Sequence, residues 1–394
     1  MHLYDTARRQ VAPLEPGPVV TLYTCGITPY DAAHLGHAAT YLAFDVLQRR
    51  LRDLGHDTRC VRNVTDVDDD ILRKARELGV HYLDLAVEEL ARFDSSMSAL
   101  GLLPAASEPR ATSAIAEILS LVDAVLDNGH AYRAGGAVYF DVSSFGAFGQ
   151  VSHLERPEML ALARERGGNP DDPNKDDPLD FVLWQPSAPD EPSWESRFGP
   201  GRPGWHIECS ALALRELGRT VDIHGGGSDL VFPHHECEAA QSEAVTGQPL
   251  ARHWMHAGMV GLDGEKMSKS LGNLVFVEDL LKEADARVAR LALLSHHYRE
   301  DWDWSDGQIE IAGERFESWT AAASDASIAS GASSDAPAGA DTPVLSAVRE
   351  RLDDDLDVPG AIAVIDEAAA GRRHDTGAAE VVAAAALLGV PLSE

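Results

Sequence analysis

Residues 19–37 read VVTLYTCGITPYDAAHLGH, and the fold follows from this stretch. Residues 19–23 are an apolar run that predicts a short buried strand, and Cys25-Gly26 with a proline close behind predicts a tight turn. Residues 38–54 continue as an apolar segment that suits a helix. This order of strand, turn and helix N-terminus favours a nucleotide phosphate, because free backbone N–H groups and the helix dipole both attract an anion.

Two histidines mark the predicted start of that helix. His34 and His37 are three positions apart, so they share one helix face and can donate hydrogen bonds to phosphate oxygens. Gly36 between them would let a flat base or a ribose approach the backbone. A helix start with incidental histidines would give the same tetrapeptide, so this pattern alone does not decide between the two interpretations.

A second motif, residues 266–273, reads KMSKSLGN. Lys266 and Lys269 lie on a short polar loop, where two cations can clamp a triphosphate and stabilise the charge of departing pyrophosphate. The alternative is a solvated basic loop on the surface. In a chain with 33 basic and 64 acidic residues, that alternative explains the paired lysines less easily.

Composition limits the class of protein. The net charge of −31 opposes non-specific binding to nucleic acid, which needs a basic surface. The first ten residues carry charges and no apolar core, so no signal peptide is expected, and no apolar run approaches ~18 residues, so no membrane span is expected. Cysteine usage in a chain of 394 residues favours a cytoplasmic protein with free thiols or a metal site: Cys25, Cys60, Cys209 and Cys237.

Strand-like and helix-like segments alternate through the first part of the chain. The pattern predicts strands at 60–66 and 137–142 and helices at 68–78, 82–100 and 111–128. This alternation is typical of an open, doubly wound α/β fold with a parallel sheet and crossover helices. Ligands bind such sheets beyond the carboxyl ends of the strands, where we expect Cys25, Asn63, Val64 and Thr65.

Residues 146–200 differ in kind, being rich in Pro, Gly, Asp and Arg, which predicts an irregular insertion with a disordered linker as the alternative. The apolar run from Phe181 to Trp184 favours the insertion, because it needs burial. The expected segments are the first half of the α/β domain (1–145), the insertion (146–200), the second half (201–262), the lysine loop with its stem (263–310) and a C-terminal α-helical bundle (311–394) that contains a flexible, low-complexity segment (324–343).

A candidate metal site combines residues that lie far apart in the sequence. Residues 232–238 read FPHHECE, and Pro233 favours a helix start that places His234 and Glu238 one turn apart on one face. With Cys25 and Cys209 they form a plausible tetrahedral zinc set of two thiolates, one imidazole and one carboxylate. Buried thiols beside a helix-start histidine are the alternative, because the cysteines do not form a local CxxC pair.

The histidine and lysine motifs together resemble the HIGH and KMSKS signatures of class I aminoacyl-tRNA synthetases, and residues 19–305 resemble their cysteine-activating branch. The resemblance implies an enzyme that uses ATP with Mg²⁺, in which His34, His37, Lys266 and Lys269 are catalytic. It also implies one Zn²⁺ per chain that ligates the thiol of substrate cysteine and is held by Cys25, Cys209, His234 and Glu238. Serine would then be rejected, because a hydroxyl is a poor zinc ligand at neutral pH.

The same resemblance implies a set of residues that bind the substrate or its adenylate. Trp205 would pack near the substrate, and Asp229 would contact a ribose or an ammonium group. The full set is Cys25, Gly26, Ile27, Thr28, Thr40, Asn63, Val64, Thr65, Trp205, His224, Gly227, Ser228, Asp229 and Val260.

The branch contains two kinds of enzyme that differ in the acceptor. Residues 26–31 and 37–41, the run ERGGNP at 165–170, and a chain end after one helical bundle resemble enzymes that join cysteine to the amine of glucosaminyl-inositol in mycothiol biosynthesis. His224 and Glu238 instead resemble cysteinyl-tRNA synthetases. We expect the small-molecule acceptor, a monomeric cytoplasmic protein, and neither nucleic acid nor membrane as a partner. The alternatives are a truncated synthetase, a ligase for another amine, and an inactive cysteine-binding module.

Overall fold

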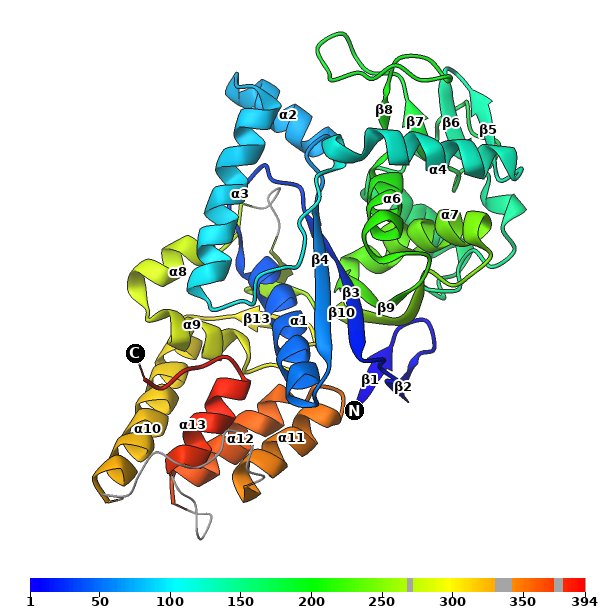
Figure 1. Ribbon diagram of the computed structural model, residues 1–394. Coiled ribbons are helices and arrows are strands. Elements are labelled where there is room, and N and C mark those ends of the chain that lie inside the picture. Colours follow the sequence, from blue (N-terminus) through cyan, green and yellow to red (C-terminus); the bar gives the residue numbers. More distant parts are fainter. Residues whose placement is uncertain (268–271, 330–341, 372–377, 394) are drawn as a thin grey trace.

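The computed structural model describes residues 1–267, 272–329, 342–371 and 378–393. At its centre lie parallel strands in the order β10-β9-β3-β4 (Figure 1). Their bounds are β3 Val19–Ile27, β4 Asp57–Val64, β9 Val221–Gly227 and β10 Ala251–Ala257. The parallel sheet expected from the alternation of strands and helices is therefore confirmed.

Helices cover both faces of this sheet, as a doubly wound fold requires. Helix α1 (Leu35–Asp53) lies on one face, and α6 (Trp205–Leu217) and α7 (Glu236–Thr246) lie on the other (Figure 1). Side chains along β3 alternate between the two layers, so that Leu22 packs in the core with α1 whereas Tyr23 and Cys25 pack in the core with α6 and α7. This alternation turns Cys25 toward the helices that carry the other candidate metal ligands.

Strand β3 is longer than the sequence predicts. The strand expected at 19–23 was to end in a Cys-Gly turn, but β3 continues to Ile27, with a register shift against β4 between Thr24 and Ile27. Gly26 permits this, because a Cβ atom there would lie 1.6 Å from the backbone oxygen of Asn63. The prediction of a turn is wrong, and the close approach of two strands explains the glycine instead.

A second, antiparallel sheet also departs from expectation. The strand predicted at 137–142 is β6, and it does not join the parallel sheet: it pairs within the order β5-β6-β7-β8. Gly135 and Gly136, with φ of 58° and 86°, form the two-residue turn of a hairpin, which is a Gly-Gly signal that the alternation pattern overlooks. The strands are β5 Ala131–Ala134, β6 Ala137–Phe140, β7 Phe181–Gln185 and β8 Arg202–Pro203.

The insertion is consequently not irregular throughout. Its apolar run forms β7, which extends the antiparallel sheet, and residues 156–165 form helix α5 (Arg156–Glu165). The helix predicted at 111–128 divides into a 3-10 turn, η1 (Ala111–Ala114), and α4 (Ile115–Asp127), and a further 3-10 turn, η2 (Val142–Ser144), follows β6.

The remaining elements surround these two sheets. An N-terminal hairpin and a small mixed sheet consist of β1 His2–Asp5 with β2 Gln10–Pro13, and β11 Val260–Leu262 with β12 Glu265–Lys266 and β13 Trp302–Trp304. Two predicted helices follow β4 as α2 Asp69–Leu78 and α3 Tyr82–Ala99. Between β9 and α7 lie the 3-10 turn η3 Ser228–Leu230 and the one-turn π-helix η4 Val231–His235.

The helices of the C-terminal part are α8 Val277–Glu283, α9 Ala286–Leu293, α10 Gly307–Ala329, α11 Pro343–Asp353, α12 Val358–Ala369 and α13 Ala378–Leu387 (Figure 1). Of these, α9, α11 and α13 contact α1. The segment expected to be flexible at 324–343 begins inside α10, which continues to Ala329, and its flexibility stays a prediction. Residues 330–341 lie outside the described residues. None of the described helices is long and apolar enough to cross a membrane.

One buried ion pair connects α9 with α1, the helix that covers one face of the parallel sheet. Arg290 of α9 pairs with Asp45 of α1, and the two residues are only 1% and 2% exposed. The guanidinium also donates hydrogen bonds to the carbonyl oxygens of Leu388 at 2.8 Å and Leu100 at 3.0 Å. A single side chain therefore links α1, the loop after α3 and the end of the chain.

Candidate active site

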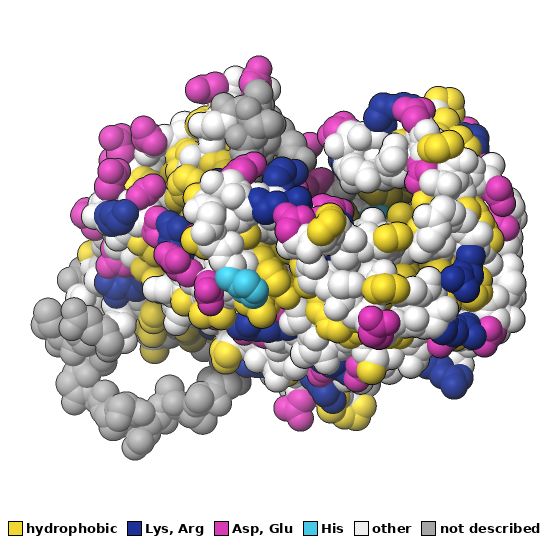
Figure 2. All heavy atoms as spheres, turned by 90° about the horizontal axis from the view of Figure 1, so that it is seen from above, with side chains coloured by type: hydrophobic (Ala, Val, Ile, Leu, Met, Phe, Trp, Pro, Cys, Tyr) yellow, Lys and Arg dark blue, Asp and Glu magenta, His cyan; other side chains and the backbone are white. Residues whose placement is uncertain are grey.

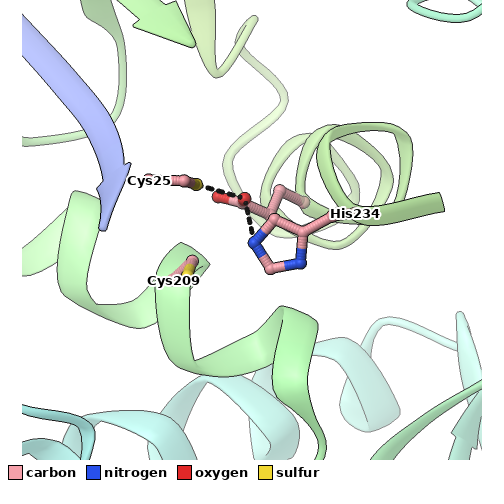
Figure 3. A group of neighbouring side chains, drawn as sticks. Cys25, Cys209 and His234 are labelled. Atoms are coloured by element: carbon pink, nitrogen blue, oxygen red, sulfur yellow. Dashed lines mark hydrogen bonds and ion pairs between the residues drawn. The ribbon is translucent and has the colours of Figure 1, made fainter. Parts of the chain in front are cut away.

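Side chains from four separate elements meet at the carboxyl end of the parallel sheet (Figure 3). Cys25 comes from β3, Cys209 from α6, His234 from η4 and Glu238 from α7, and all four are buried. Their ligand atoms lie within 4.8 Å of one another. The structure therefore brings together the complete metal-ligand set that the sequence suggests, which we call the thiol cluster.

Glu238 lies at the centre of the thiol cluster. Its Oε1 lies 3.2 Å from Sγ of Cys25 and 2.9 Å from Nε2 of His234. Its Oε2 lies 3.4 Å from Nε2 of His224 and has no hydrogen-bond partner within the described part of the chain. A buried carboxylate oxygen without a donor is costly unless a cation satisfies it. Two thiols, one imidazole and this carboxylate are a donor set that fits zinc.

The charges in the thiol cluster are arranged around His234. Burial opposes the charged form of this ring, but Glu238 and Cys209 raise the pKa of His234 to about 10. Burial likewise opposes the charged carboxylate, yet His224 and His234 hold the pKa of Glu238 well below its ordinary value. Burial also disfavours the thiolate of Cys209, but the hydrogen bond with Cys25 and the charge on His234 lower the pKa of Cys209 to about 7. The positive charge on His234 is thus stabilised by the carboxylate of Glu238 and by the thiolate form of Cys209.

Cys25 differs from Cys209 in its electrostatics. Burial and the hydrogen bond with Cys209 raise the pKa of Cys25 well above its ordinary value. The hydroxyl of Tyr41 donates a hydrogen bond to the backbone oxygen of Cys25 at 3.2 Å, which fixes this end of β3. The raised pKa of Cys25 favours its thiol form, so an ion that binds it must displace a proton.

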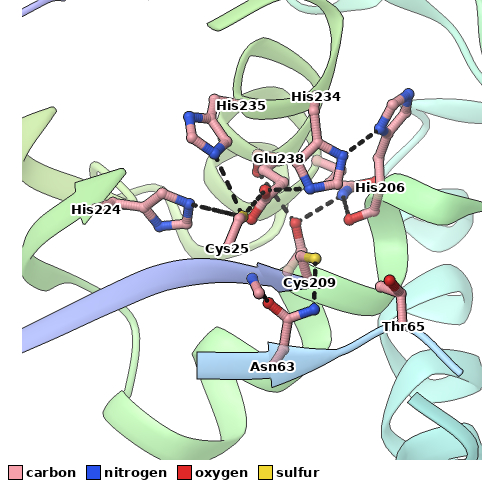
Figure 4. Close-up of polar contacts among 12 residues, drawn as sticks. Cys25, Asn63, Thr65, His206, Cys209, His224, His234, His235 and Glu238 are labelled. Atoms are coloured by element: carbon pink, nitrogen blue, oxygen red, sulfur yellow. Dashed lines mark hydrogen bonds and ion pairs between the residues drawn. The ribbon is translucent and has the colours of Figure 1, made fainter. Parts of the chain in front are cut away.

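Three histidines that the sequence analysis missed surround these ligands (Figure 4). Nε2 of His235 lies 3.3 Å from Sγ of Cys25, and Nδ1 of the same ring lies 2.7 Å from Nε2 of His256. Nδ1 of His206 lies 2.9 Å from Nδ1 of His234. The position of His235, directly after a predicted ligand, was a usable signal. His206 and His256 belong to no motif, so only the fold reveals them.

His224, which is expected to bind the substrate, lies directly beside the thiol cluster. It is fully buried, and its ring centroid lies 5.1 Å from that of Tyr23 and 4.7 Å from that of Trp254. Ligand atoms of Cys25, His224, His235 and Glu238 form a second group within 4.8 Å. The side chain of His224 therefore faces the ligands rather than an open surface.

The two motif histidines lie together at the start of α1. His34 is the N-cap residue of this helix, and its Nδ1 accepts a hydrogen bond from the backbone N–H of Gly36 at 3.2 Å. The rings of His34 and His37 stack with centroids 3.8 Å apart. The predicted juxtaposition at a helix N-terminus is confirmed, while the catalytic roles of both rings stay predictions.

The chain that follows the lysine loop is bonded to the same helix start. The backbone N–H of Leu35 donates to the carbonyl oxygen of Val275 at 3.0 Å. Lys266 is the last residue of β12, but its side chain, and Lys269 as a whole, lie outside the described residues. The structure therefore places the chain beyond the loop beside the histidine motif, and the roles of the two lysines stay predictions.

Several predicted substrate-binding residues lie at the ends of strands, and Thr40 lies on α1. The hydroxyls of Thr28 and Thr65 are 2.8 Å apart, and Thr28 also donates to Asp68 at 2.8 Å. Thr40 donates from its hydroxyl to the carbonyl oxygen of Gly36 at 3.0 Å. Ile27 ends β3, Val64 ends β4 and Val260 begins β11. Contact of any of these residues with a substrate stays a prediction.

Gly227, Ser228 and Asp229 lie at the end of β9 and in η3. A Cβ atom on Gly227 would lie 2.6 Å from Oδ1 of Asp229, so the Asp229 side chain lies close against this turn. The guanidinium of Arg166, from the insertion, donates to the carbonyl oxygens of Asp229 and Phe232. Figure 2 shows the molecule from above, hollowed between its two halves, with charged side chains of both signs around the hollow.

Comparison with known proteins identifies the family. Residues 10–314 match the model for the catalytic domain of class I tRNA synthetases (C). The chain is 48% identical over 400 residues to the L-cysteine:1D-myo-inositol 2-amino-2-deoxy-alpha-D-glucopyranoside ligase of Streptosporangium roseum, and this match covers 100% of the chain and 96% of the relative. The ligase of the same name from Mycobacterium ulcerans is 49% identical over 404 residues, with the same coverage. The chain belongs to this ligase family.

Solved structures of class I synthetases share the fold of this chain. Mycobacterium tuberculosis methionyl-tRNA synthetase in complex with methionyl-adenylate superposes with a TM-score of 0.63 at 18% identity, covering 94% of this chain and 90% of that one. A putative arginyl-tRNA synthetase from Campylobacter jejuni gives a TM-score of 0.63 at 14% identity, covering 96% and 94%. These likenesses confirm the predicted α/β architecture.

Proposed function

We propose that this ligase activates L-cysteine with ATP as cysteinyl-adenylate and joins it to the amine of glucosaminyl-inositol, the amino sugar in the name of its relatives. The observation that carries the proposal is the position of the thiol cluster. Four side chains that could hold a thiol-binding metal ion have their ligand atoms within 4.8 Å of one another. They lie at the carboxyl ends of the parallel strands, where doubly wound folds bind their substrates.

In the first step, the carboxylate of cysteine attacks the α-phosphate of ATP, and pyrophosphate leaves with Mg²⁺. His34 and His37 stand at the N-terminus of α1, where the helix dipole and free N–H groups favour phosphate. Lys266 and Lys269 would hold the charge of the departing pyrophosphate. The protein thus contributes mainly positioning and electrostatic stabilisation.

In the second step, the amine lone pair attacks the adenylate carbonyl, an amide forms and AMP leaves with the bonding electrons. The amine must lose a proton in this step. His224 and Asp229 lie near enough to the site to be candidates for accepting it, but His224 is fully buried beside the thiol cluster. Asp229, in the turn after β9, is therefore the better candidate.

We further propose that Cys25, Cys209, His234 and Glu238 would hold one Zn²⁺ per chain. The bound ion would supply a centre that prefers a thiolate to a hydroxyl, which selects cysteine over serine. Support comes from the donor types, from their burial and from Oε2 of Glu238, which accepts no hydrogen bond from the described residues. We also propose that the protein is a monomer. We propose the cytoplasm as its location, because four free cysteines suit a reducing compartment.

A second candidate function is transfer of cysteine to tRNA. It is favoured by the pair of His224 and Glu238, which resemble the synthetase and lie 3.4 Å apart. Against it stands the net charge of −31, because tRNA binding depends on neutralising phosphates. The experiment that separates the two is AMP release from ATP and cysteine in the presence of each acceptor. Acceleration by the amino sugar alone supports the ligase, whereas acceleration by tRNA alone supports the second candidate.

A further inference from the structure

Asn63 joins three elements of the candidate site through one side chain (Figure 4). It is the second-last residue of β4, and it is 1% exposed. Its Oδ1 accepts a hydrogen bond from the backbone N–H of Gly26 on β3 at 2.8 Å, and its Nδ2 lies 3.2 Å from Sγ of Cys209 on α6. Both ends of the amide are therefore occupied inside the protein.

The orientation of this amide follows from its partners. A backbone N–H can only donate, so the oxygen of the amide must face Gly26. The NH₂ group then necessarily faces Cys209, whose sulfur accepts the hydrogen bond. A sulfur accepts such a bond better as a thiolate than as a thiol, because the added negative charge strengthens the bond.

The approach of β3 to β4 makes this reach possible. A Cβ atom on Gly26 would lie 1.6 Å from the backbone oxygen of Asn63, so the two strands can be this close only with a glycine. Gly26 directly follows Cys25, one of the two thiols of the cluster. The side chain of Asn63 consequently sets the spacing between the strand that carries Cys25 and the helix that carries Cys209.

We propose that Asn63 is a positioning residue for the thiol cluster: it holds Cys209 as a hydrogen-bonded thiolate at a fixed distance from Cys25. This inference rests on the proposed metal function. Partners of this kind fix the orientation of a metal ligand and tune its electron donation. A hydrogen bond to the thiolate withdraws charge from it, which leaves a bound ion a stronger acceptor for the thiol of the substrate.

Two variants separate this role from general support of the fold. Asn63→Asp keeps the shape and the acceptor for Gly26 but removes the N–H donor to Cys209. Asn63→Leu removes both bonds at a similar side-chain size. Asn128→Asp, a matched change on an exposed residue at the end of α4, is the control. Because Asn63→Asp retains the bond to Gly26, it still tests the proposal if Asn63→Leu fails to fold.

The decisive readout is the thiolate-to-cobalt charge-transfer band of the Co²⁺-loaded proteins. Both Asn63 variants should shift this band to lower energy, because the sulfur loses a hydrogen bond, while the control should leave it unchanged. Zinc affinity, measured by chelator competition, should fall about 10- to 100-fold in Asn63→Leu. The KM for cysteine should rise in both Asn63 variants, with the KM for ATP within about twofold of wild type.

The possible failures are distinguishable. A wild-type protein that binds no zinc or cobalt overturns the metal proposal, and this inference with it. A wild-type protein that binds the metal, with an unshifted band in Asn63→Asp, overturns the inference about Asn63 and leaves the metal proposal standing. A band shift that appears in Asn128→Asp as well overturns the inference too, since the effect would then not come from the bond to Cys209.

Discussion

Nε2 of His234 lies 2.9 Å from Oε1 of Glu238, one helical turn further along the chain. This contact spans the junction between η4 and α7, so the local backbone alone brings the imidazole and the carboxylate together. The two thiols reach the same point from β3 and α6. A metal bound here would therefore connect three segments of the catalytic domain.

Removing one thiol should empty this centre. Cys209→Ser is expected to purify with little zinc, because a hydroxyl replaces a thiolate ligand. Cys60→Ser is the matched control, since Cys60 is also buried but contacts Thr24 rather than the thiol cluster. Metal analysis of both variants and of the wild type is the measurement. Full zinc occupancy in Cys209→Ser would remove Cys209 from the ligand set.

The thiol cluster should discriminate between cysteine and serine. We expect serine-dependent ATP–pyrophosphate exchange to be slower than cysteine-dependent exchange by on the order of 10³-fold or more, because a site that bonds to one group rejects an analogue that lacks it. Cys25→Ser should reduce this preference, whereas Cys237→Ser, which alters a buried thiol outside the ligand set, should not. Comparable rates with the two amino acids in the wild-type protein would contradict selection by a metal–thiol bond.

The lysine loop should act on the chemical step rather than on the metal. Lys269→Ala is expected to slow cysteine-dependent exchange by ~10²-fold or more, because it removes a charge aimed at the leaving phosphates. Lys282→Ala, which breaks only an exposed ion pair with Asp279, is the control. Zinc content should match the wild type in both. An exchange rate within about twofold of wild type for Lys269→Ala would show that the loop is structural.

The pair of Asp45 and Arg290 should make stability depend on pH. Burial alone would raise the pKa of Asp45, but Arg290 and Arg49 hold it below its ordinary value of 3.8. Because the folded-state pKa is the lower one, the stabilisation is complete above pH 3.8 and is lost as the pH falls through the folded-state pKa.

Asp45→Asn tests this pair directly. It should lower the free energy of unfolding at pH 7 by about 3–5 kcal/mol, because it leaves a buried guanidinium unpaired. The difference from wild type should shrink as the pH drops below 3.8. Asp279→Asn, at an exposed ion pair, should cost less than about 1 kcal/mol. Denaturant unfolding across this pH range is the measurement, and a pH-independent difference would contradict the argument.

The local patterns of the sequence predict much of the fold and of the thiol cluster. The strand, the helix start and the alternation predict β3, α1 and β4, and the turn spacing predicts the contact between His234 and Glu238. Cys25 and Cys209 entered the candidate set by residue type, and the family resemblance supported that choice, because residues so far apart leave no local signature.

Other features depend on partners that no local pattern contains. His256 lies 2.7 Å from His235 and also contacts Thr6, which is 250 positions away in the chain. The predicted contact of Asn63 with the adenylate stays a prediction, whereas its side-chain bonds to Gly26 and Cys209 join partners that meet only when three elements pack. The hairpin of β5 and β6 was predictable from its Gly-Gly turn, and the wider α/β alternation obscured it.

The central claim is that cysteine is transferred to an amino sugar, and the mass of the product tests it most directly. The purified protein is supplied with ATP, Mg²⁺ and cysteine together with both glucosaminyl-inositol and tRNA, and the products are analysed by mass spectrometry. We predict an amide of cysteine with glucosaminyl-inositol, AMP in equal amount, and unmodified tRNA. Cysteinyl-tRNA without any amide on the amino sugar would contradict the claim and leave only the activation of cysteine standing.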